Sequence, residues 1–235
     1  MLDLTRFSVL TFDCYGTLID WETGILNALR PILAAHGVAR SDDETLELFG
    51  ELEAELEAGP YRTYQEVLAL VVDGFGERLG FQPTASEREA FSTSVGDWPA
   101  FSDTVEALHA LAKHYRLVIL SNVDDALFAG SAKRLQTDFA DVITAQQVGS
   151  YKPDPRNFAV ALERVGVERE RVLHVAQSLF HDIAPANAAG LTTVWVNRRY
   201  NRPGFGATPP ASAQPALEVP DLATLARLAD AAFGA

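Results

Sequence analysis

The chain has 235 residues, of which 48% are hydrophobic and 22% are charged, proportions that are ordinary for a globular protein with a full core. Its formal net charge of −13 argues against nucleic acids and anionic membrane surfaces as partners, because binding to either needs clustered lysine and arginine. The single cysteine, Cys14, excludes an intrachain disulfide, and the first residues lack the basic start and long apolar run of a signal peptide, so the cytoplasm is the expected location.

A short apolar run at residues 8–13 predicts a buried strand that ends at an acid. The turn after Asp13 contains Tyr15, Gly16 and Thr17. Ligands of open α/β sheets bind at the carboxyl edge of the strands, and an ionised aspartate there can act as a nucleophile that forms an ester. Taken alone, Asp13 is equally well explained as a helix-capping residue.

The next segment, residues 21–98, contains no convincing strand and predicts a helical domain inserted after the first strand. Residues 1–20 and 99–235 are expected to form the core. The acidic run at residues 42–57 is interpreted as a solvated helix face without a functional role. The predicted helices of this domain span residues 25–36, 43–57, 61–79 and 86–95.

From residue 102 onward strands and helices alternate, which predicts a parallel sheet with helices on both faces, and hence an α/β fold. The segment at 201–220 is rich in proline and glycine and is predicted to be a surface loop. The predicted strands span residues 115–121, 142–145, 172–176 and 192–196, and the predicted helices span residues 102–113, 124–135, 156–165 and 222–233.

Polar residues follow the later strands, where they would lie at the same edge of the sheet as Asp13. Ser121 and Asn122 can bind a carboxylate or a leaving group there, although Ser-Asn is also a common turn pair. Lys152 precedes a proline that stiffens its turn, although most single lysines are solvated surface groups. The strand at 172–176 leads into a further polar group, which consists of Gln177, Ser178, His181 and Asp182.

Four segments resemble, in their order along the chain, the four motifs of the haloacid dehalogenase superfamily. They are the turn at residues 13–17, the pair at 121–122, the turn at Lys152 and the polar group at 177–182. The resemblance implies a Rossmann-like parallel sheet and a helical cap domain, with Asp13 as the nucleophile. It also implies that Lys152 keeps Asp13 ionised and that Asp182 holds Lys152 or orients water. The implied substrate-binding residues are Tyr15, Thr17, Ser121, Asn122, Gln177 and Ser178.

Two positions depart from the phosphatases of this superfamily, whose acids hold magnesium. Those enzymes carry an aspartate at the position of Tyr15, and a Gly-Asp pair where this chain has Ala176 and Gln177. An amide is a poor substitute for a carboxylate on a hard cation. The expected function is therefore a metal-independent and cofactor-free hydrolase of the 2-haloacid dehalogenase type, which attacks the carbon next to a carboxylate. A magnesium-dependent small-molecule phosphatase stays as an alternative, and so does a binding module without catalysis.

The chain also departs from the haloacid dehalogenases, because their substrate-binding cap arginine has no clear match. Arg62, near Tyr64, is the nearest candidate for that role. Residues 12–25, 93–101 and 143–153 are similar to those of azetidine-2-carboxylate hydrolases, which open a strained ring, so opening of a ring C–N bond is a further alternative. In that reaction His181 or Tyr15 would donate the proton to the amine, and otherwise His181 is a solvent-facing residue at a helix start. The expected partners are a small carboxylate substrate and, as in relatives, a second copy in a homodimer.

Overall fold

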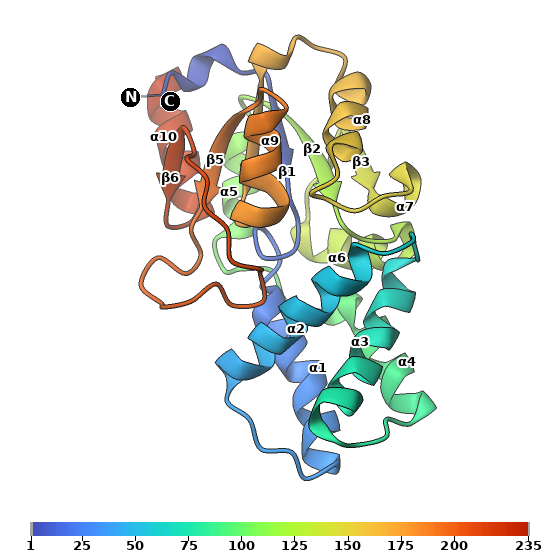
Figure 1. Cartoon of the computed structure of the whole chain (residues 1–235). Coiled ribbons are helices and arrows are strands. Elements are labelled where there is room, and N and C mark those ends of the chain that lie inside the picture. Colours follow the sequence, from blue (N-terminus) through green and yellow to red (C-terminus); the bar gives the residue numbers. More distant parts are fainter. Residues whose placement is uncertain (1, 235) are drawn as a thin grey trace.

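Six parallel strands form the core of the protein, for which the computed structural model describes residues 2–234 (Figure 1). The strand order is β3-β2-β1-β4-β5-β6, so all strands end at one edge of the sheet. The predicted α/β fold with a parallel sheet is confirmed. The strands are β1 (Val9–Phe12), β2 (Arg116–Ser121), β3 (Asp141–Thr144), β4 (Val172–Ala176), β5 (Thr192–Val196) and β6 (Leu217–Val219).

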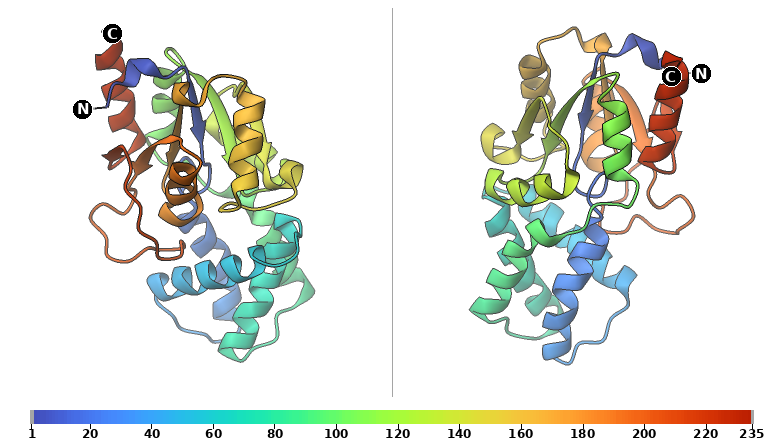
Figure 2. Two further views of the ribbon diagram at one scale, coloured as in Figure 1. Left: turned by 45° about the horizontal axis from the view of Figure 1, so that its top comes forward. Right: turned by 180° about the vertical axis from the view of Figure 1, so that it is seen from behind.

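The helices of the core cover both faces of this sheet (Figure 2). They are α5 (Thr104–Leu111), α6 (Asp125–Leu135), α7 (Ala145–Val148), α8 (Pro155–Val165), α9 (Ala184–Ala188) and α10 (Leu222–Phe233). Apolar side chains of α5 and α10 pack on one face, and those of α8 and α9 pack on the other. Because both faces are covered, every residue of β1 and β4 is buried, which explains the nearly continuous apolar sequences of these strands.

A second group of helices lies at the edge where the strands end (Figure 1). We call it the helical layer; it consists of α1 (Trp21–Ala35), α2 (Asp42–Glu57), α3 (Tyr64–Leu79), α4 (Ala85–Thr93) and the 3₁₀ turn η2 (Ser94–Asp97). The starts of α2, α3 and α4 are set by their own sequences, because each begins with a capping box in which a hydroxyl and a glutamate satisfy each other's backbone N–H groups.

The structure differs from the sequence prediction in a few elements. Helix α1 begins four residues earlier than expected, because the Asp20 carboxylate accepts a hydrogen bond from the N–H of Thr23 and so caps the helix. Strand β6 lies within the segment 201–220 that was predicted to be a loop, since three residues among prolines give little periodic pattern. The prediction also missed the short helices α7 and α9.

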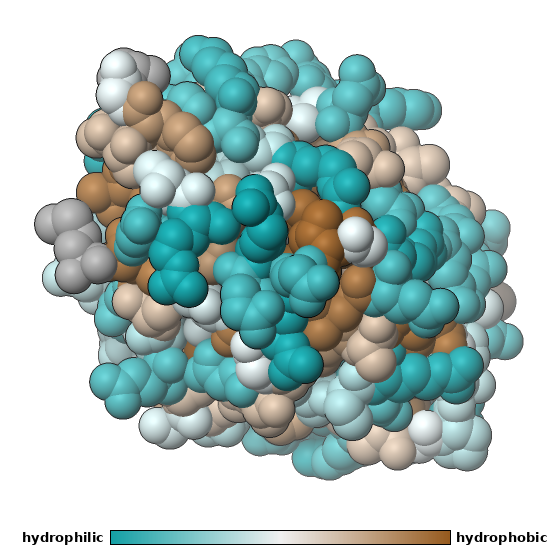
Figure 3. Space-filling view, turned by 90° about the horizontal axis from the view of Figure 1, so that it is seen from above, coloured by the Kyte–Doolittle hydropathy of each residue, from teal (hydrophilic) through white to brown (hydrophobic). Residues whose placement is uncertain are grey.

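Seen from the end opposite to the helical layer, the surface is mostly hydrophilic, and its apolar side chains form small separate groups (Figure 3). Between residues 2 and 234, none of the helices combines the length and the apolar character that crossing a membrane requires.

Trp98 ties the helical layer to the turn that follows β1. Its indole is fully buried, its ring meets the edge of Tyr15 with centroids 5.8 Å apart, and its Nε1–H donates to Ser94 Oγ. Gly24 in α1 packs so closely on this ring that a Cβ atom there would overlap the indole. Gly24 is therefore required by close packing.

Replacing Gly24 with alanine should destabilise the protein by about 1–3 kcal/mol, because the methyl group overpacks against Trp98. Urea unfolding measures this change. Gly96→Ala is the matched control, because its Cβ would lie in ordinary contact, 3.5 Å from Cα of Gly130. Equal stabilities of the two variants would contradict the packing argument.

Candidate active site

Three charged side chains meet at the carboxyl edge of the sheet. The Nζ atom of Lys152 donates to Asp13 Oδ1 at 2.9 Å, to Asp182 Oδ1 at 2.7 Å and to the carbonyl oxygen of Leu120 at 3.0 Å. All three charged residues are buried. An ammonium with three acceptors thus lies between two carboxylates, and no water is needed to satisfy its donors.

The turn after β1 holds Asp13 in place. Thr17 Oγ1 donates to Asp13 Oδ2 at 2.7 Å and accepts from the backbone N–H of Gln177 at 2.8 Å. Gly16 has a φ of +91°, a conformation that favours glycine, and it lets the chain reverse tightly after Asp13. Thr17 therefore positions the nucleophile candidate and does not line the cavity described below.

Asp182 lies in the π-helical turn η4 (Leu179–Ile183) after β4. Its Oδ1 atom also lies 3.0 Å from Nε2 of His174, whose Nδ1 lies 2.9 Å from Thr11 Oγ1. A carboxylate can only accept, so His174 donates from Nε2, and in the neutral ring Nδ1 is then the acceptor for the Thr11 hydroxyl. Oδ1 of Asp182 thus has two donors, whereas its Oδ2 atom is buried without a partner.

The environments of the three charged groups set their protonation. Burial raises the pKa of Asp13, and the opposing effects of Lys152 and Thr17 only reduce that rise. Burial would also raise the pKa of Asp182, but Lys152 and His174 outweigh it and hold that pKa below its usual value. Although burial opposes it, the two carboxylates raise the pKa of Lys152. Lys152 and Asp182 therefore stay charged, and Asp13 is the more basic carboxylate of the two.

The loop after β2 holds the backbone of Lys152. Asn122 Oδ1 accepts from the N–H of Lys152 at 2.7 Å, and Asn122 Nδ2 donates to the carbonyl oxygen of Lys152 at 3.0 Å. The same Nδ2 donates to Glu57 Oε2 at 3.1 Å, so this amide also contacts helix α2.

A small cavity of about 30 Å³, about the room of one water molecule, lies against these groups. Four buried side-chain atoms of the residues that line it have no hydrogen-bond partner: Glu57 Oε1, Ser121 Oγ, His181 Nε2 and Asp182 Oδ2. Buried polar atoms in proteins are nearly always paired. Their clustering around one cavity indicates that a polar ligand completes the site.

Helix α2 brings two glutamates to this cavity, Glu53 and Glu57, which lie one helical turn apart. Their side chains are buried, so the interpretation of residues 42–57 as a solvated face is wrong for these two, although Glu51 and Glu55 are exposed. Tyr64 donates from its hydroxyl to Glu53 Oε1 at 2.6 Å. Burial raises the pKa of Glu53 to about 8 and raises the pKa of Glu57 well above its usual range.

A pattern in the sequence could have identified these glutamates. Leu46 and Phe49 begin a buried stripe on α2, and the stripe continues at positions 53 and 57 with helical spacing. An acid at a position where the helix is expected to be apolar indicates a buried and functional charge.

Most of the residues singled out in the sequence come together at the cavity. Nine of them line it: Asp13, Tyr15, Tyr64, Ser121, Asn122, Lys152, Ser178, His181 and Asp182. The sequence analysis missed the other three lining residues, Trp21, Glu53 and Glu57.

Three residues singled out in the sequence do not line the cavity. Besides Thr17, the side chain of Gln177 lines a neighbouring cavity instead. The structure also does not bring Arg62 to the site, because its Nη1 atom donates to the carbonyl oxygen of Pro60. Among the described residues that line the cavity there is no arginine.

The two candidate proton donors face the cavity with different constraints. The Tyr15 hydroxyl lies 2.9 Å from Ser131 Oγ, and burial raises the pKa of Tyr15 well above its usual value, so this group holds its proton tightly. Burial lowers the pKa of His181 to about 4, so its imidazole is neutral at pH 7. Glu57 Oε2 lies 3.9 Å from His181 Nε2, and the carboxyl of Glu57 holds a proton more readily than this imidazole does.

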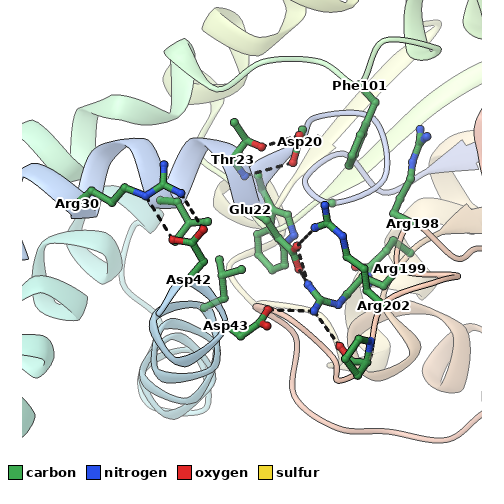
Figure 4. Close-up of a pocket in the computed structure, with 16 residues that line it drawn as sticks. Asp20, Glu22, Thr23, Arg30, Asp42, Asp43, Phe101, Arg198, Arg199 and Arg202 are labelled. Atoms are coloured by element: carbon green, nitrogen blue, oxygen red, sulfur yellow. Dashed lines mark hydrogen bonds and ion pairs between the residues drawn. The ribbon is translucent and has the colours of Figure 1, made fainter. Parts of the chain in front are cut away.

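A larger neighbouring cavity of about 580 Å³ lies between the core and the helical layer (Figure 4). Trp21 lines both cavities. Its arginines are engaged with acids: Arg199, from the loop after β5, pairs with Glu22 at 2.8 Å and with Asp43 at 3.3 Å. Arg198 pairs with Asp103 at 2.8 Å. The pairs of Arg199 join the core to α1 and α2.

Comparison with known proteins places these observations in a family. The model of the haloacid dehalogenase-like hydrolases matches residues 7–190. (S)-2-haloacid dehalogenase 1 of Pseudomonas sp. (strain CBS-3) is 28% identical over 200 residues, which cover 82% of this chain and 85% of that protein. (S)-2-haloacid dehalogenase 4A of Burkholderia cepacia is 26% identical over 219 residues, which cover 89% of this chain and 90% of that protein. The solved structure of the L-2-haloacid dehalogenase of Xanthobacter autotrophicus superposes with a TM-score of 0.80 at 21% identity, over 94% of this chain and 98% of that one, and so shares the fold.

Replacing Lys152 with methionine should cost about 3–5 kcal/mol of stability at pH 7, because two buried carboxylates lose their counter-ion. Without the ammonium, the pKa values of Asp13 and Asp182 rise in the folded state above their unfolded values. The loss is therefore present at pH 7 and shrinks as the pH falls through the raised values.

Urea unfolding at pH 7 and at pH 5 measures both effects. Lys113→Met is the matched control, since that lysine is exposed. A Lys152→Met variant that is as stable as the control at pH 7 would show that the two carboxylates are not held ionised by Lys152.

Proposed function

The chain belongs to the haloacid dehalogenase-like hydrolase family, and we propose that it is a metal-independent hydrolase in which Asp13 attacks the carbon next to a substrate carboxylate. One observation carries this proposal: a buried aspartate faces a cavity while Lys152 and Thr17 hold its two oxygens. Such fixation aims a carboxylate at an electrophile without loss of orientation on binding.

In the first step a carboxylate oxygen of Asp13 forms a bond to the carbon, and the leaving group departs with the electron pair of the bond that breaks. The charge on Asp13 is lost as the ester forms. Lys152 then carries a positive charge that is balanced by Asp182 alone. The ammonium is therefore placed to polarise the carbonyl of the new ester.

In the second step water attacks the carbonyl carbon of the Asp13 ester, and the bond from that carbon to the substrate oxygen breaks. One proton of the water ends on the 2-hydroxy acid and the other is released. The unpartnered Oδ2 atom of Asp182 lines the cavity and is the proposed acceptor for the proton of this water. The Asp13 carboxylate is restored with one oxygen from water.

Halide is the first candidate for the leaving group, because the two relatives named above, which are aligned over 82% and 89% of this chain, are 2-haloacid dehalogenases. The second candidate is the ring nitrogen of azetidine-2-carboxylate. It is favoured by the cavity wall, where the described residues include two glutamates and no arginine for the carboxylate of a haloacid.

A magnesium-dependent phosphatase has less support from the site. The Tyr15 hydroxyl contacts Ser131, and the side chain of Gln177 lines the neighbouring cavity. Neither residue offers a carboxylate beside Asp13, and a hard cation prefers such oxygen ligands.

We further propose that residues 21–98 act as a cap. The cavity has room for about one water molecule, and the helical layer lines it through Trp21, Glu53, Glu57 and Tyr64, so a displacement of this layer would make room for a larger substrate. We place the enzyme in the cytoplasm, because its only cysteine, Cys14, is a buried free thiol.

Turnover in H₂¹⁸O tests the ester route. After many turnovers ¹⁸O should appear in the Asp13 peptide, and a single turnover should give unlabelled product, because the product oxygen comes from Asp13. Mass spectrometry is used with chloroacetate, both 2-chloropropionates and L-azetidine-2-carboxylate in EDTA.

Asp13→Asn should abolish this turnover, and the peptide that contains Asp154 serves as an internal control for labelling. Label that enters the product in the first turnover would show direct attack by water. Phosphate release from a phosphate ester that needs magnesium, with no turnover of any carboxylate, would show a phosphatase.

The pH dependence follows from the raised pKa of Asp13. The nucleophile has to be ionised, so kcat/KM should fall as the pH drops through a value above that of an ordinary aspartate. Thr17→Val removes a hydrogen bond that lowers this pKa and should move the acid limb upward by about one pH unit. Thr17→Ser keeps the hydroxyl and should leave the limb in place. If the acid limb of kcat/KM lies at the same pH in both variants, it does not report the ionisation of Asp13.

A further inference from the structure

We propose that Glu53 and Glu57, which we call the acid pair, are the specificity-determining residues of this site and bind a protonated nitrogen of the substrate. This inference rests on the proposed function, because it names the class of carboxylate that reacts at Asp13. The substrate class is a small carboxylate that also carries an amine, with strained cyclic amino acids as its first members.

The position of the acid pair supports a role in binding. Both side chains come from one face of α2 and line the same cavity as Asp13. One oxygen of each is held, since Tyr64 donates to Glu53 Oε1 and Asn122 donates to Glu57 Oε2. Glu57 Oε1 is buried without a partner, so this wall offers an acceptor that the protein itself does not satisfy.

The charges around the cavity favour a cation. Lys152 is the only lysine or arginine among the described residues that line it, and its three donors are already taken by Asp13, Asp182 and Leu120. The acid pair adds two carboxyl groups to this wall. A substrate carboxylate would find no free cation at this wall, whereas a bound ammonium would stabilise the ionised form of both glutamates.

The protonation of the acid pair fits this arrangement. Glu57 faces Glu53 on its own helix, Tyr64 on α3, and Asp13, Tyr15, Lys152, His181 and Asp182 from the core. Burial raises the pKa of both glutamates, so both are held protonated at neutral pH unless a cation lies beside them. A bound ammonium favours the ionised form, and binding should therefore release a proton.

The chemistry of a nitrogen leaving group needs such a wall. When Asp13 attacks the carbon, the electrons of the C–N bond stay on the nitrogen. A protonated ring nitrogen then leaves as a neutral amine, whereas an unprotonated one would have to leave as a strongly basic anion. The acid pair keeps the nitrogen protonated until the bond breaks, and the Ser121 hydroxyl, which is also unpartnered, remains for the substrate carboxylate.

Binding of two unreactive ligands of the same shape tests the inference without turnover. L-Proline carries a ring ammonium beside its carboxylate, and cyclopentanecarboxylate lacks the nitrogen. Calorimetry at pH 7 should show that the wild-type protein prefers proline by at least tenfold. The measured heat should depend on the ionisation enthalpy of the buffer, because a proton is released.

Variants of α2 locate the preference. Glu57→Gln and Glu53→Gln should each reduce the preference for proline about tenfold, and Glu57→Gln should also abolish proton release. Glu55→Gln is the matched control on the exposed face of the same helix and should behave as the wild type. Equal or tighter binding of cyclopentanecarboxylate by the wild type would overturn the inference, and so would a failure to bind proline at millimolar concentration or an unchanged preference in both acid-pair variants.

The outcomes separate this inference from the proposed reaction. Asp13-dependent turnover of 2-chloropropionate without a preference for proline would leave the reaction standing and overturn the acid pair as an amine site. A preference for proline that depends on Glu57, without Asp13-dependent turnover of any carboxylate, would support the amine site and overturn the reaction.

Discussion

The buried ammonium of Lys152 is the interaction on which the rest of the site depends. A charge without water is tolerated in a protein only when it is paired and its donors are satisfied. Lys152 meets both conditions only if Asp13, Asp182 and the carbonyl of Leu120 converge on it. These groups come from the ends of β1, β4 and β2, so the central strand order β2-β1-β4 is what makes the site possible. The order of the strands thus also assembles this charged cluster.

The sequence predicted this part of the protein well because its determinants are local. Strands that are buried on both faces appear as apolar runs, and the polar residue after each run marks the shared edge. Asp13 and Ser121 could be singled out in this way before any contact was known, whereas Lys152 and Asp182 were singled out through the resemblance to the superfamily's motifs, and the structure brings all four together. Strand β6 was missed because it has three residues and gives no such run.

The acid pair shows where prediction from sequence ended. Glu53 and Glu57 lie in a helix with exposed acids at positions 51 and 55, and a charged helix face is usually solvated. Their burial depends on what α2 packs against, which includes Tyr64 of α3 and, 65 positions beyond Glu57, Asn122. The prediction that Arg62 belongs to the site also depended on packing that the sequence does not show. Arg62 is close in sequence to the site residue Tyr64, but its side chain donates to the carbonyl oxygen of Pro60.

The loop after β2 connects the helical layer to the chemistry. Asn122 holds Lys152 with two hydrogen bonds and donates a third to Glu57. Two residues later, the Asp124 carboxylate accepts from the N–H groups of Tyr64 and Gln65 and so caps α3, whose Tyr64 hydroxyl holds Glu53.

One short loop therefore positions the cation of the site and both acids of the facing wall. Movement of the helical layer away from the sheet would break these links and expose the acid pair to water, where a carboxyl ionises at its ordinary pKa. Closure without a cation would instead desolvate two carboxylates, which is costly. A substrate that carries its own ammonium removes that cost, so the proposed preference would arise at the step in which the helical layer closes over the bound molecule.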